Sequence, residues 1–332
     1  MDEKTIKTLK SQKSKIFDDC QNSKRILEKQ HYSVFGNSAV QICRWTKKSL
    51  RDEGCCYKER FYGIKSHECC QMSPFIACPN SCLHCWRPIE LNLRHGKTKE
   101  IIEPEKIIEE CIKAQRKLLS GFKGSKKTNL GKWKEAQEPS QFAISLIGEP
   151  TLYPKLAELI LELRKQGKTT FLVTNGLYPE KLLELKKKKA LPTQLYLSLN
   201  TPNKKMYNLW HKSKLKDAWE RFNKTVSLFP RLPTRKVIRL TLVRDLNMIE
   251  EENYAKLIKK NQADFIEVKG FMSVGFARKR LGYEKMPSHE EIKEFAEKLL
   301  VYLPEYKFLD EQEVSRVVLL GKDKKKMKIH KI

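Results

Sequence analysis

Short apolar runs alternate with longer amphipathic stretches from residue 71 onward. The short runs are rich in β-branched and aromatic residues, as buried strands are, whereas apolar residues in the longer stretches recur every three or four positions, as in helices. Strands are predicted at 142–146, 169–174, 194–199, 236–243 and 264–268, after a first strand just before Cys78. Helices are predicted at 104–119, 153–166, 179–187, 215–228, 250–260 and 290–302. This alternation indicates about six βα units, with parallel strands joined by crossover helices.

A barrel-like α/β fold of this kind places its chemistry at the C-terminal ends of the strands. The polar motifs described below fall at such ends. Residues 120–140 break the pattern because they are poor in apolar residues and rich in glycine and lysine. We therefore predict an exposed loop there.

The composition of the chain indicates the cellular compartment in which we expect it. The chain of 332 residues is 40% hydrophobic and 32% charged, and no apolar run approaches the ~20 residues of a membrane span. The N-terminus lacks the apolar core of a signal peptide. Ten cysteines would suggest disulfides in a secreted chain, but without an export signal we expect a cytoplasmic protein whose thiolates bind metal.

The charge balance is strongly one-sided, with 67 Lys and Arg against 40 Asp and Glu, a net charge of +27. Heat adaptation raises lysine and glutamate together and does not explain such an excess. A polyanionic partner does, and nucleic acid is the first candidate. Basic runs at 123–134, 186–189 and 322–331 are candidate contacts, although each alone is typical of a solvated face.

Three cysteines, Cys78, Cys82 and Cys85, form a C-x3-C-x2-C motif. Three thiolates suit iron–sulfur or zinc, but a closed zinc site and an ordinary [4Fe–4S] cluster each take four protein ligands. A three-cysteine cluster leaves one iron open. The spacing resembles that of the radical S-adenosylmethionine (SAM) superfamily, which implies a partial (β/α)6 TIM-like barrel and a cluster whose open iron binds the amine and carboxylate of SAM.

Two strand-end motifs match the same superfamily. Gly148 and Glu149 follow the strand at 142–146, where the superfamily holds the SAM amine. A glycine allows close backbone approach and a carboxylate complements an ammonium. Asn175 ends the next strand, and the resemblance places it near SAM as well. Taken without the cysteines, both segments also fit ordinary turns.

Three further residues complete the predicted SAM site. Ser198 and Asn200 end the strand at 194–199, where the superfamily often holds the ribose or carboxylate of SAM. Asn200 stands where related chains often carry Asp, so it adds a hydrogen-bonding group but no charge. His84 occupies a position that is usually aromatic and faces the adenine; it can stack there, or compete as a metal ligand.

A second cysteine triplet, Cys43, Cys56 and Cys69, lies upstream at even spacings. Beside a radical SAM core, these thiolates predict a second [4Fe–4S] cluster that is again one ligand short. Free buried cysteines are the alternative. We expect that simpler fate for the remaining cysteines, Cys20, Cys55, Cys70 and Cys111.

The sequence around these motifs is more specific than the motifs themselves. The relevant segments are CRWTKK (43–48), CYK (56–58), FYGI (61–64), SHEC (66–69), CWRP (85–88), ISLIGEPTLYP (144–154) and IEVKG (266–270). Over residues 30–300 the chain resembles the tRNA 4-demethylwyosine synthase family, in its short archaeal-type form without a flavodoxin domain. That form implies an external electron donor of the flavodoxin or ferredoxin type.

The resemblance implies the chemistry. SAM cleavage yields a 5′-deoxyadenosyl radical, which removes hydrogen from the methyl group of N1-methylguanosine-37 of tRNA-Phe, and the product radical condenses with pyruvate to form 4-demethylwyosine. Pyruvate is expected to chelate the second cluster with a lysine assisting, or to form a Schiff base with Lys47 or Lys48. Trp45, Trp86 or Trp210 is a candidate for base stacking.

The predicted organisation has three parts: an extension with the second triplet at 1–70, a radical SAM core at 71–285, and a helix, strand and basic tail at 286–332. We expect a monomer. Two other functional classes compete: another radical SAM enzyme, either RNA-modifying or a glycyl-radical activase, and a zinc-stabilised RNA-binding protein.

Overall fold

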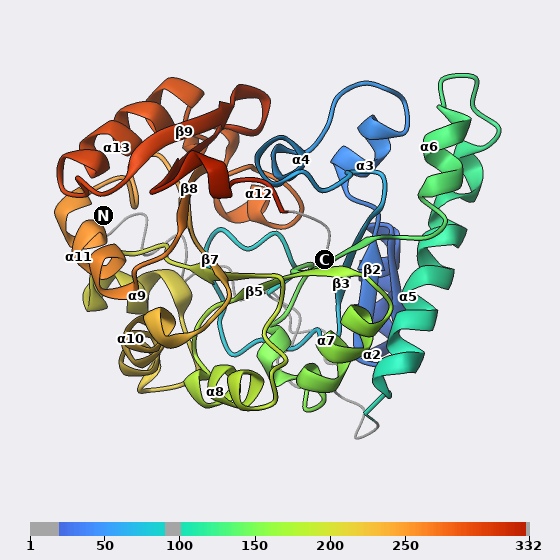
Figure 1. The fold of residues 1–332 in the computed structure, drawn as a ribbon, viewed down its shortest axis with the longest axis horizontal. Helices are drawn as coiled ribbons and strands as arrows, with labels where there is room; N and C mark the ends of the chain where they lie inside the picture. Colours follow the sequence, from blue (N-terminus) through green and yellow to red (C-terminus); the bar gives the residue numbers. More distant parts are fainter. Residues whose placement is uncertain (1–19, 90–100, 330–332) are drawn as a thin grey trace.

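The computed structural model describes residues 20–89 and 101–329, and within them a single sheet carries the fold (Figure 1). Its ten strands follow the order β1-β2-β3-β4-β5-β6-β7-β8-β10-β9. The six central strands are parallel: β3 (Cys69–Ser73), β4 (Gln141–Ile144), β5 (Thr169–Thr174), β6 (Gln194–Ser198), β7 (Arg235–Leu242) and β8 (Phe265–Gly270). The predicted parallel α/β arrangement is confirmed, as a row of strands that is not closed into a ring among the described residues.

Crossover helices cover the outer face of this sheet, along an arc from α13 to α5 in Figure 1. They are α5 (Pro104–Leu119), α7 (Leu156–Lys165), α8 (Pro179–Lys187), α9 (Lys204–His211), α10 (Ala218–Leu228), α11 (Glu251–Asn261) and α13 (His289–Val301). The apolar stripes of these helices and the outward side chains of the strands form the largest core cluster. The six predicted strands and helices are present, with α9 in addition.

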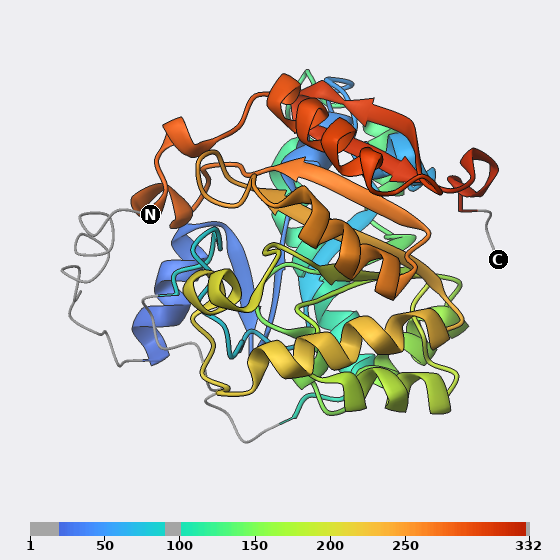
Figure 2. The ribbon, with the colours of Figure 1, turned by 90° about the vertical axis from the view of Figure 1, so that its left-hand side faces the viewer.

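Antiparallel strands extend the sheet at both edges. These are β1 (Tyr32–Phe35) and β2 (Ser38–Gln41) before β3, and β10 (Val317–Gly321) and β9 (Lys307–Gln312) beside β8. Both terminal parts of the chain therefore share one sheet with the centre. Helices α2 (Cys20–Lys29), α3 (Arg44–Ser49), α4 (Tyr57–Tyr62), α6 (Leu130–Glu135) and α12 (Ala277–Arg280) complete the fold, with single helical turns at 120–122, 150–152, 229–231, 283–285, 313–315 and 324–326 (Figure 2).

Helix α4 packs inside the curve of the sheet. Its Phe61 and Tyr62 rings belong to a second core cluster with Phe171 and Phe265, which stand near the starts of their strands. The Tyr62 ring lies 6.0 Å from each of those two rings, edge to face. One end of the barrel interior is thus filled by aromatic side chains, and the open space lies toward the C-terminal ends of the strands.

The C-terminal tail packs against this aromatic cluster and holds it in place. Met327 is buried in the same cluster, and the Ile329 amide donates to the Tyr62 carbonyl at 2.9 Å. The Arg235 guanidinium donates to the carbonyls of Lys326 and Met327. Residues 322–329 are therefore an anchored segment with exposed lysines, while the last residues of the predicted basic run lie outside the described part.

One sequence expectation is wrong. Residues 120–140 are not simply a loop, because they contain the turn at 120–122 and α6. Asn129 caps α6 by accepting a hydrogen bond from the Lys132 amide at 3.1 Å, and the Trp133 indole donates to the Leu119 carbonyl. A short capped helix held by one tryptophan has too few apolar residues to show periodicity. No helix of the described part is long and apolar enough to span a membrane.

Candidate functional site

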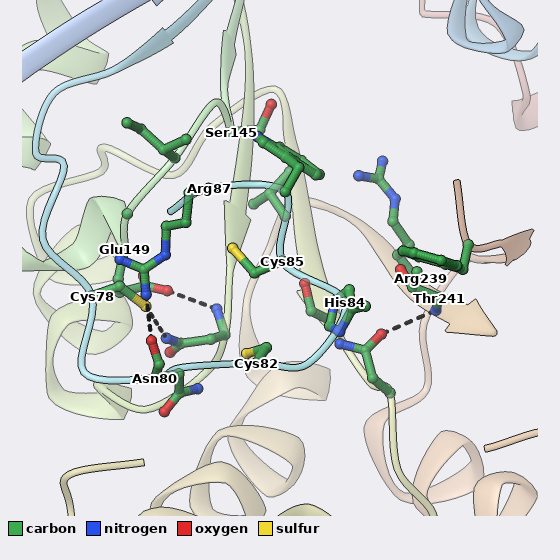
Figure 3. Close-up of a pocket in the computed structure, with 18 of the residues that line it drawn as sticks. Cys78, Asn80, Cys82, His84, Cys85, Arg87, Ser145, Glu149, Arg239 and Thr241 are labelled. Atoms are coloured by element: carbon green, nitrogen blue, oxygen red, sulfur yellow. Dashed lines mark hydrogen bonds between the residues drawn. The ribbon is translucent and has the colours of Figure 1, made fainter. Parts of the chain in front are cut away.

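A cavity of about 300 Å³ opens at the C-terminal ends of β4 to β8 (Figure 3). Cys78, Cys82 and Cys85 line it from the loop that follows β3. Every residue predicted to bind SAM also lines it: His84, Gly148, Glu149, Asn175, Ser198 and Asn200. The structure thus gathers in one place nine residues that were selected separately from the sequence.

The cysteine loop is held by backbone contacts with the end of α9. The Ser81 amide donates to the His211 carbonyl at 2.8 Å, and the Leu83 amide donates to the Trp210 carbonyl at 3.1 Å. His211 also places Nδ1 at 3.0 Å from the Cys82 sulfur. These contacts fix the positions of the thiols independently of their own short sequence.

Glu149 joins the ends of two strands. Its Oε1 accepts hydrogen bonds from the Thr151 amide (3.1 Å), the Thr151 hydroxyl (2.6 Å) and the Thr174 hydroxyl (2.7 Å), and its Oε2 accepts from the Asn175 amide at 2.8 Å. Burial raises the pKa of this carboxyl, and the hydrogen bonds oppose the rise. Glu149 therefore shapes the cavity wall as well as presenting a carboxyl group to it.

The backbone conformation and the close packing at position 148 require a glycine. Its φ is +79°, and a Cβ there would overlap the carbonyl oxygen of Phe75. The adjacent Glu149 amide donates to the Ala77 carbonyl at 2.7 Å. A glycine at this position thus lets the loop after β4 lie directly against the segment that leads to the cysteine loop.

The remaining predicted SAM residues differ in how strongly they are held. Asn175 places Nδ2 3.7 Å from the Cys78 sulfur, and Asn200 accepts a hydrogen bond from the Thr241 amide at 3.0 Å. His84 stacks on Trp210 and accepts a hydrogen bond from its indole at 2.9 Å. Burial, with a smaller effect from a nearby arginine, lowers the pKa of His84 to about 4, so the ring is neutral at pH 7.

A second cavity of about 280 Å³ is lined by Cys43, Cys56 and Cys69. Cys43 and Cys56 precede α3 and α4, and Cys69 begins β3. Burial raises the pKa of the Cys56 and Cys69 thiols to about 12. The triplet predicted from even spacing does meet around one space, although its members come from three different elements.

The lysines predicted to act here lie elsewhere. Lys47 and Lys48 are partly exposed in the last turn of α3 and do not line the cavity. Lys58, in α4, does line it and is 9% exposed, with Nζ 5.0 Å from the centre of the Tyr196 ring. Burial lowers the pKa of Lys58. Its place in the chain, two residues after Cys56, is the sequence signal that could have identified it.

A buried charged network lies behind both cavities. Arg239 of β7 and Glu267 of β8 are register partners, with Nε donating to Oε2 at 2.8 Å. Tyr57 and Tyr62 of α4 donate their hydroxyls to the same carboxylate at 3.1 and 2.8 Å. Sequence reasoning assigned no role to this pair, although each charge lies between apolar neighbours in its strand.

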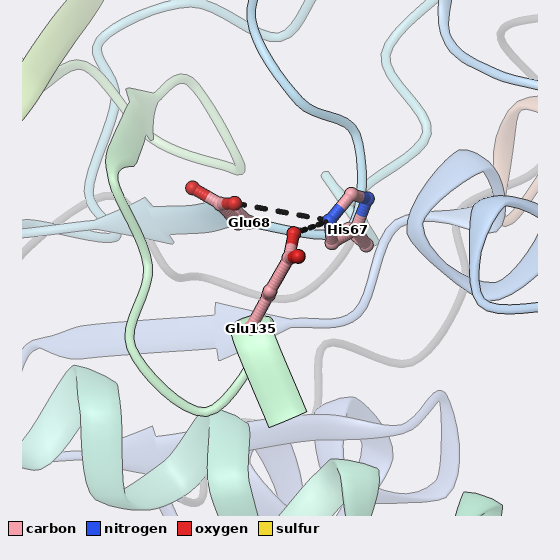
Figure 4. Close-up of side chains that lie close together, drawn as sticks. All are labelled: His67, Glu68 and Glu135. Carbon is pink, nitrogen blue, oxygen red and sulfur yellow. Dashed lines mark hydrogen bonds and ion pairs between the residues drawn. The ribbon is translucent and has the colours of Figure 1, made fainter. Parts of the chain in front are cut away.

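His67, Glu68 and Glu135 bring their ligand atoms within 4.8 Å of one another (Figure 4). Glu135 accepts from His67 at 2.8 Å, and Lys65 bridges Glu68 (2.6 Å) and Glu135 (3.0 Å). These carboxylates therefore already have cationic or hydrogen-bonding partners. The group joins α6 to the start of β3.

Across residues 20–89 and 101–329, no other set of three potential ligands converges within that distance. The sulfurs of each cysteine triplet are thus more widely spread than the ~3.8 Å separation implied by four Zn–S bonds of ~2.3 Å. Three soft thiolates spread around an open space fit an iron–sulfur cluster better than a single zinc ion.

The fold and the cysteine loop define the class of protein. A family model described as the radical SAM superfamily matches residues 72–258, more than half of the chain, and the chain belongs to that superfamily. SAM and a [4Fe–4S] cluster are accordingly its cofactors. A second model, described as wyosine base formation, matches residues 260–322.

Individual relatives identify the family within this superfamily. The chain is 49% identical over 300 residues to the S-adenosyl-L-methionine-dependent tRNA 4-demethylwyosine synthase of Pyrococcus abyssi, over 90% of this chain and 88% of that one. It is 36% identical over 307 residues to the S-adenosyl-L-methionine-dependent tRNA 4-demethylwyosine synthase TYW1 of Mus musculus, over 91% of this chain and 42% of that one. The chain therefore belongs to the tRNA 4-demethylwyosine synthase family.

Solved structures agree with this assignment. A crystal structure of archaeal TYW1 matches with a TM-score of 0.76 and 32% identity, over 94% of this chain and 100% of that one. A structure of TYW1 with a lysine-pyruvate adduct bound matches with a TM-score of 0.83 and 35% identity, over 94% and 98%. The predicted fold class and family are confirmed, and the activase and zinc-protein alternatives are set aside.

Proposed function

We propose that this chain condenses N1-methylguanosine-37 of tRNA-Phe with pyruvate to form 4-demethylwyosine. The observation that supports the proposal is that the two cysteine-lined cavities adjoin. Six residues line both of them: Trp86, Ser145, Arg239, Lys269, Met272 and Val274. A carbon–carbon condensation needs two reactants to meet, and this common wall offers a meeting place.

In this proposal Cys78, Cys82 and Cys85 hold the SAM-binding cluster, which supplies a 5′-deoxyadenosyl radical when it is reduced with SAM bound. The chain's own residues position and enclose the reactants. Asn175 and Asn200 present amide groups at the ends of β5 and β6, and neutral His84 offers a ring for the adenine.

We assign the second cavity to pyruvate, with Cys43, Cys56 and Cys69 holding a second [4Fe–4S] cluster. We assign the reaction with pyruvate to Lys58 rather than to Lys47 or Lys48, because it alone of the three lines the cavity. Its amine attacks the keto carbon of pyruvate, water leaves, and a Schiff base forms. A lysine-pyruvate adduct in a related structure is consistent with this assignment.

The target base enters beside Trp86. This indole is 39% exposed and lines both cavities, whereas Trp210 is 3% exposed and already stacked on His84. An anticodon-loop base can be splayed from its neighbours and stacked on such a ring. The net charge of +27 supplies attraction for the phosphates.

The decisive experiment is anaerobic incubation of the reconstituted protein with SAM, reductant, pyruvate and tRNA-Phe bearing N1-methylguanosine-37, with nucleoside analysis by mass spectrometry. We expect the tricyclic base. Lys58→Arg should abolish it and prevent borohydride trapping of pyruvate on the protein, while Lys48→Arg, the matched control, should leave both intact. Trapping that survives in Lys58→Arg would reject the role of Lys58.

We propose in addition an external electron donor of the flavodoxin or ferredoxin type, a monomeric protein and a cytoplasmic location, as the sequence predicts. Light scattering of the reconstituted protein tests the monomer, and reduction by purified flavodoxin and ferredoxin tests the donor.

A further inference from the structure

The guanidinium of Arg239 is only partly satisfied. Its Nε donates to Glu267, but neither Nη makes a hydrogen bond among the described residues, and Nη2 is buried. A buried donor without a partner is costly, and more so when it is charged. Because Arg239 lines both cavities, a bound acceptor is a natural partner for the free side of its fork.

The second cavity has a surplus of positive charge. Four basic side chains line it, Arg44, Lys58, Arg239 and Lys269, and no carboxylate is among its described lining residues. Glu267 behind the wall is 0% exposed and is already shared by Arg239 and two tyrosine hydroxyls. Arg44 is exposed and Lys58 reacts as a neutral amine, so the always charged guanidinium of Arg239 is the group best suited to hold an anionic occupant.

Arg239 is also close to the lysine assigned to pyruvate. The Arg239 Cζ lies 4.6 Å, and the Lys58 Nζ 5.0 Å, from the centre of the same Tyr196 ring. Lys269 is less available because its Nζ donates to the Ser315 carbonyl at 2.6 Å. In Figure 3 the Arg239 side chain lies apart from the loop that carries the three cysteines, near the strand to which it belongs.

We propose that Arg239 binds the carboxylate of the 2-oxo acid substrate through its Nη groups, and that Glu267 is the positioning residue that orients it. The inference rests on the proposed function, because it takes pyruvate to be the occupant. While Lys58 exchanges the keto oxygen for its nitrogen with loss of water, the carboxylate keeps its charge against Arg239. A planar, bidentate fork suits a carboxylate and gives the cavity its preference for 2-oxo acids over neutral ketones.

The test compares pyruvate with pyruvamide, its uncharged analogue, in the reconstituted enzyme. Arg239→Gln should raise the KM for pyruvate in tRNA modification by roughly ten- to a hundredfold, as expected for one charged hydrogen-bonding pair. In borohydride trapping, the wild-type preference for pyruvate over pyruvamide should collapse in the variant. Equal losses for both ketones, or an unchanged KM, would overturn the inference.

Controls separate binding from folding. Arg239→Gln combined with Glu267→Gln leaves no lone buried charge and should show the same loss of preference, while Arg239→Lys should keep part of it. Lys269→Gln, which also removes a cation from both walls, should change the preference much less; an equal change would overturn the assignment to Arg239.

The failure of the proposed function would look different. Suppose that tRNA modification occurs without any trapped adduct at Lys58, but Arg239→Gln still raises the KM for pyruvate alone. The binding of the carboxylate by Arg239 would then be supported, and the Schiff base at Lys58 would be rejected. If the adduct at Lys58 forms normally and substitution of Arg239 does not change it, the Schiff base would be supported and the role of Arg239 would be rejected.

Discussion

The two cavities are built in opposite ways. The first takes its three cysteines from a single loop of eight residues and its other predicted ligand residues from the ends of neighbouring strands. The second takes its cysteines from three separate elements, and charged residues of β7 and β8 complete its wall. The first is therefore specified by local sequence, and the second by tertiary packing.

This difference predicts different sensitivities. A locally specified site should tolerate changes elsewhere and fail when its own ligands are removed. A site assembled by packing should also fail when a support behind its wall, such as Glu267, is removed.

The largest effects should come from the cysteines. The reconstituted protein should hold about eight irons, four at each triplet. Replacing Cys78, Cys82 and Cys85 with alanine should abolish 5′-deoxyadenosine formation. Replacing Cys43, Cys56 and Cys69 should halve the iron, retain some 5′-deoxyadenosine and abolish the tricyclic base. Iron assay and chromatography measure the outcomes, and full iron in the second variant would refute the second cluster.

Glu267→Gln should reduce the free energy of unfolding by about 3–5 kcal/mol, because it leaves the buried Arg239 without its counter-charge. Urea unfolding monitored by circular dichroism measures the change. The double variant with Arg239→Gln should recover much of the stability. If Glu267→Gln were no worse than Glu68→Gln in the His67 cluster, whose Glu135 is exposed, the network would not support the second cavity.

Gly148→Ala should destabilise the protein by roughly 1–3 kcal/mol through its left-handed backbone and its overlap with the Phe75 carbonyl. It should lower SAM cleavage and leave pyruvate trapping unchanged. Gly167→Ala is the matched control: its φ is +68°, but an added Cβ has nothing within 4 Å. Equal effects of the two substitutions would show that backbone strain alone, and not the overlap at the first cavity, is responsible.

The smallest effect concerns the tail. Binding of tRNA should weaken with salt at a slope steeper than about −4, for at least five phosphate contacts. Replacing Lys324, Lys325 and Lys326 with glutamine avoids unfolding the anchored segment, and the slope should flatten by roughly 0.7–0.9 for every lysine that neutralises a phosphate. The same change at the exposed Lys123, Lys126 and Lys127 is the comparison. A flat salt response of the unaltered protein would reject the nucleic-acid interpretation of the charge.

The sequence predicted the first cavity well because its residues follow strands whose apolar runs are unmistakable. It missed Arg239 and Glu267 because the two charges can be recognised as a pair only when the register of β7 against β8 is known. It named Lys47 and Lys48 and assigned no role to Lys58, because all three follow a cysteine of the triplet within a few residues and only the fold shows which of them lines the cavity. The roles of all these residues remain predictions for the experiments above.

The second cavity takes its lining from distant parts of the chain, and this has a consequence for biosynthesis. Cys43, Cys56 and Cys69 leave the ribosome well before β8, whose Lys269 lies 200 residues further along the chain than Cys69. At about 5–20 residues per second, roughly 10–40 s separate the two events. During that interval the part of the wall formed by Arg239 and Lys269 is missing, so a cluster can be enclosed in this cavity only after β8 has been synthesised.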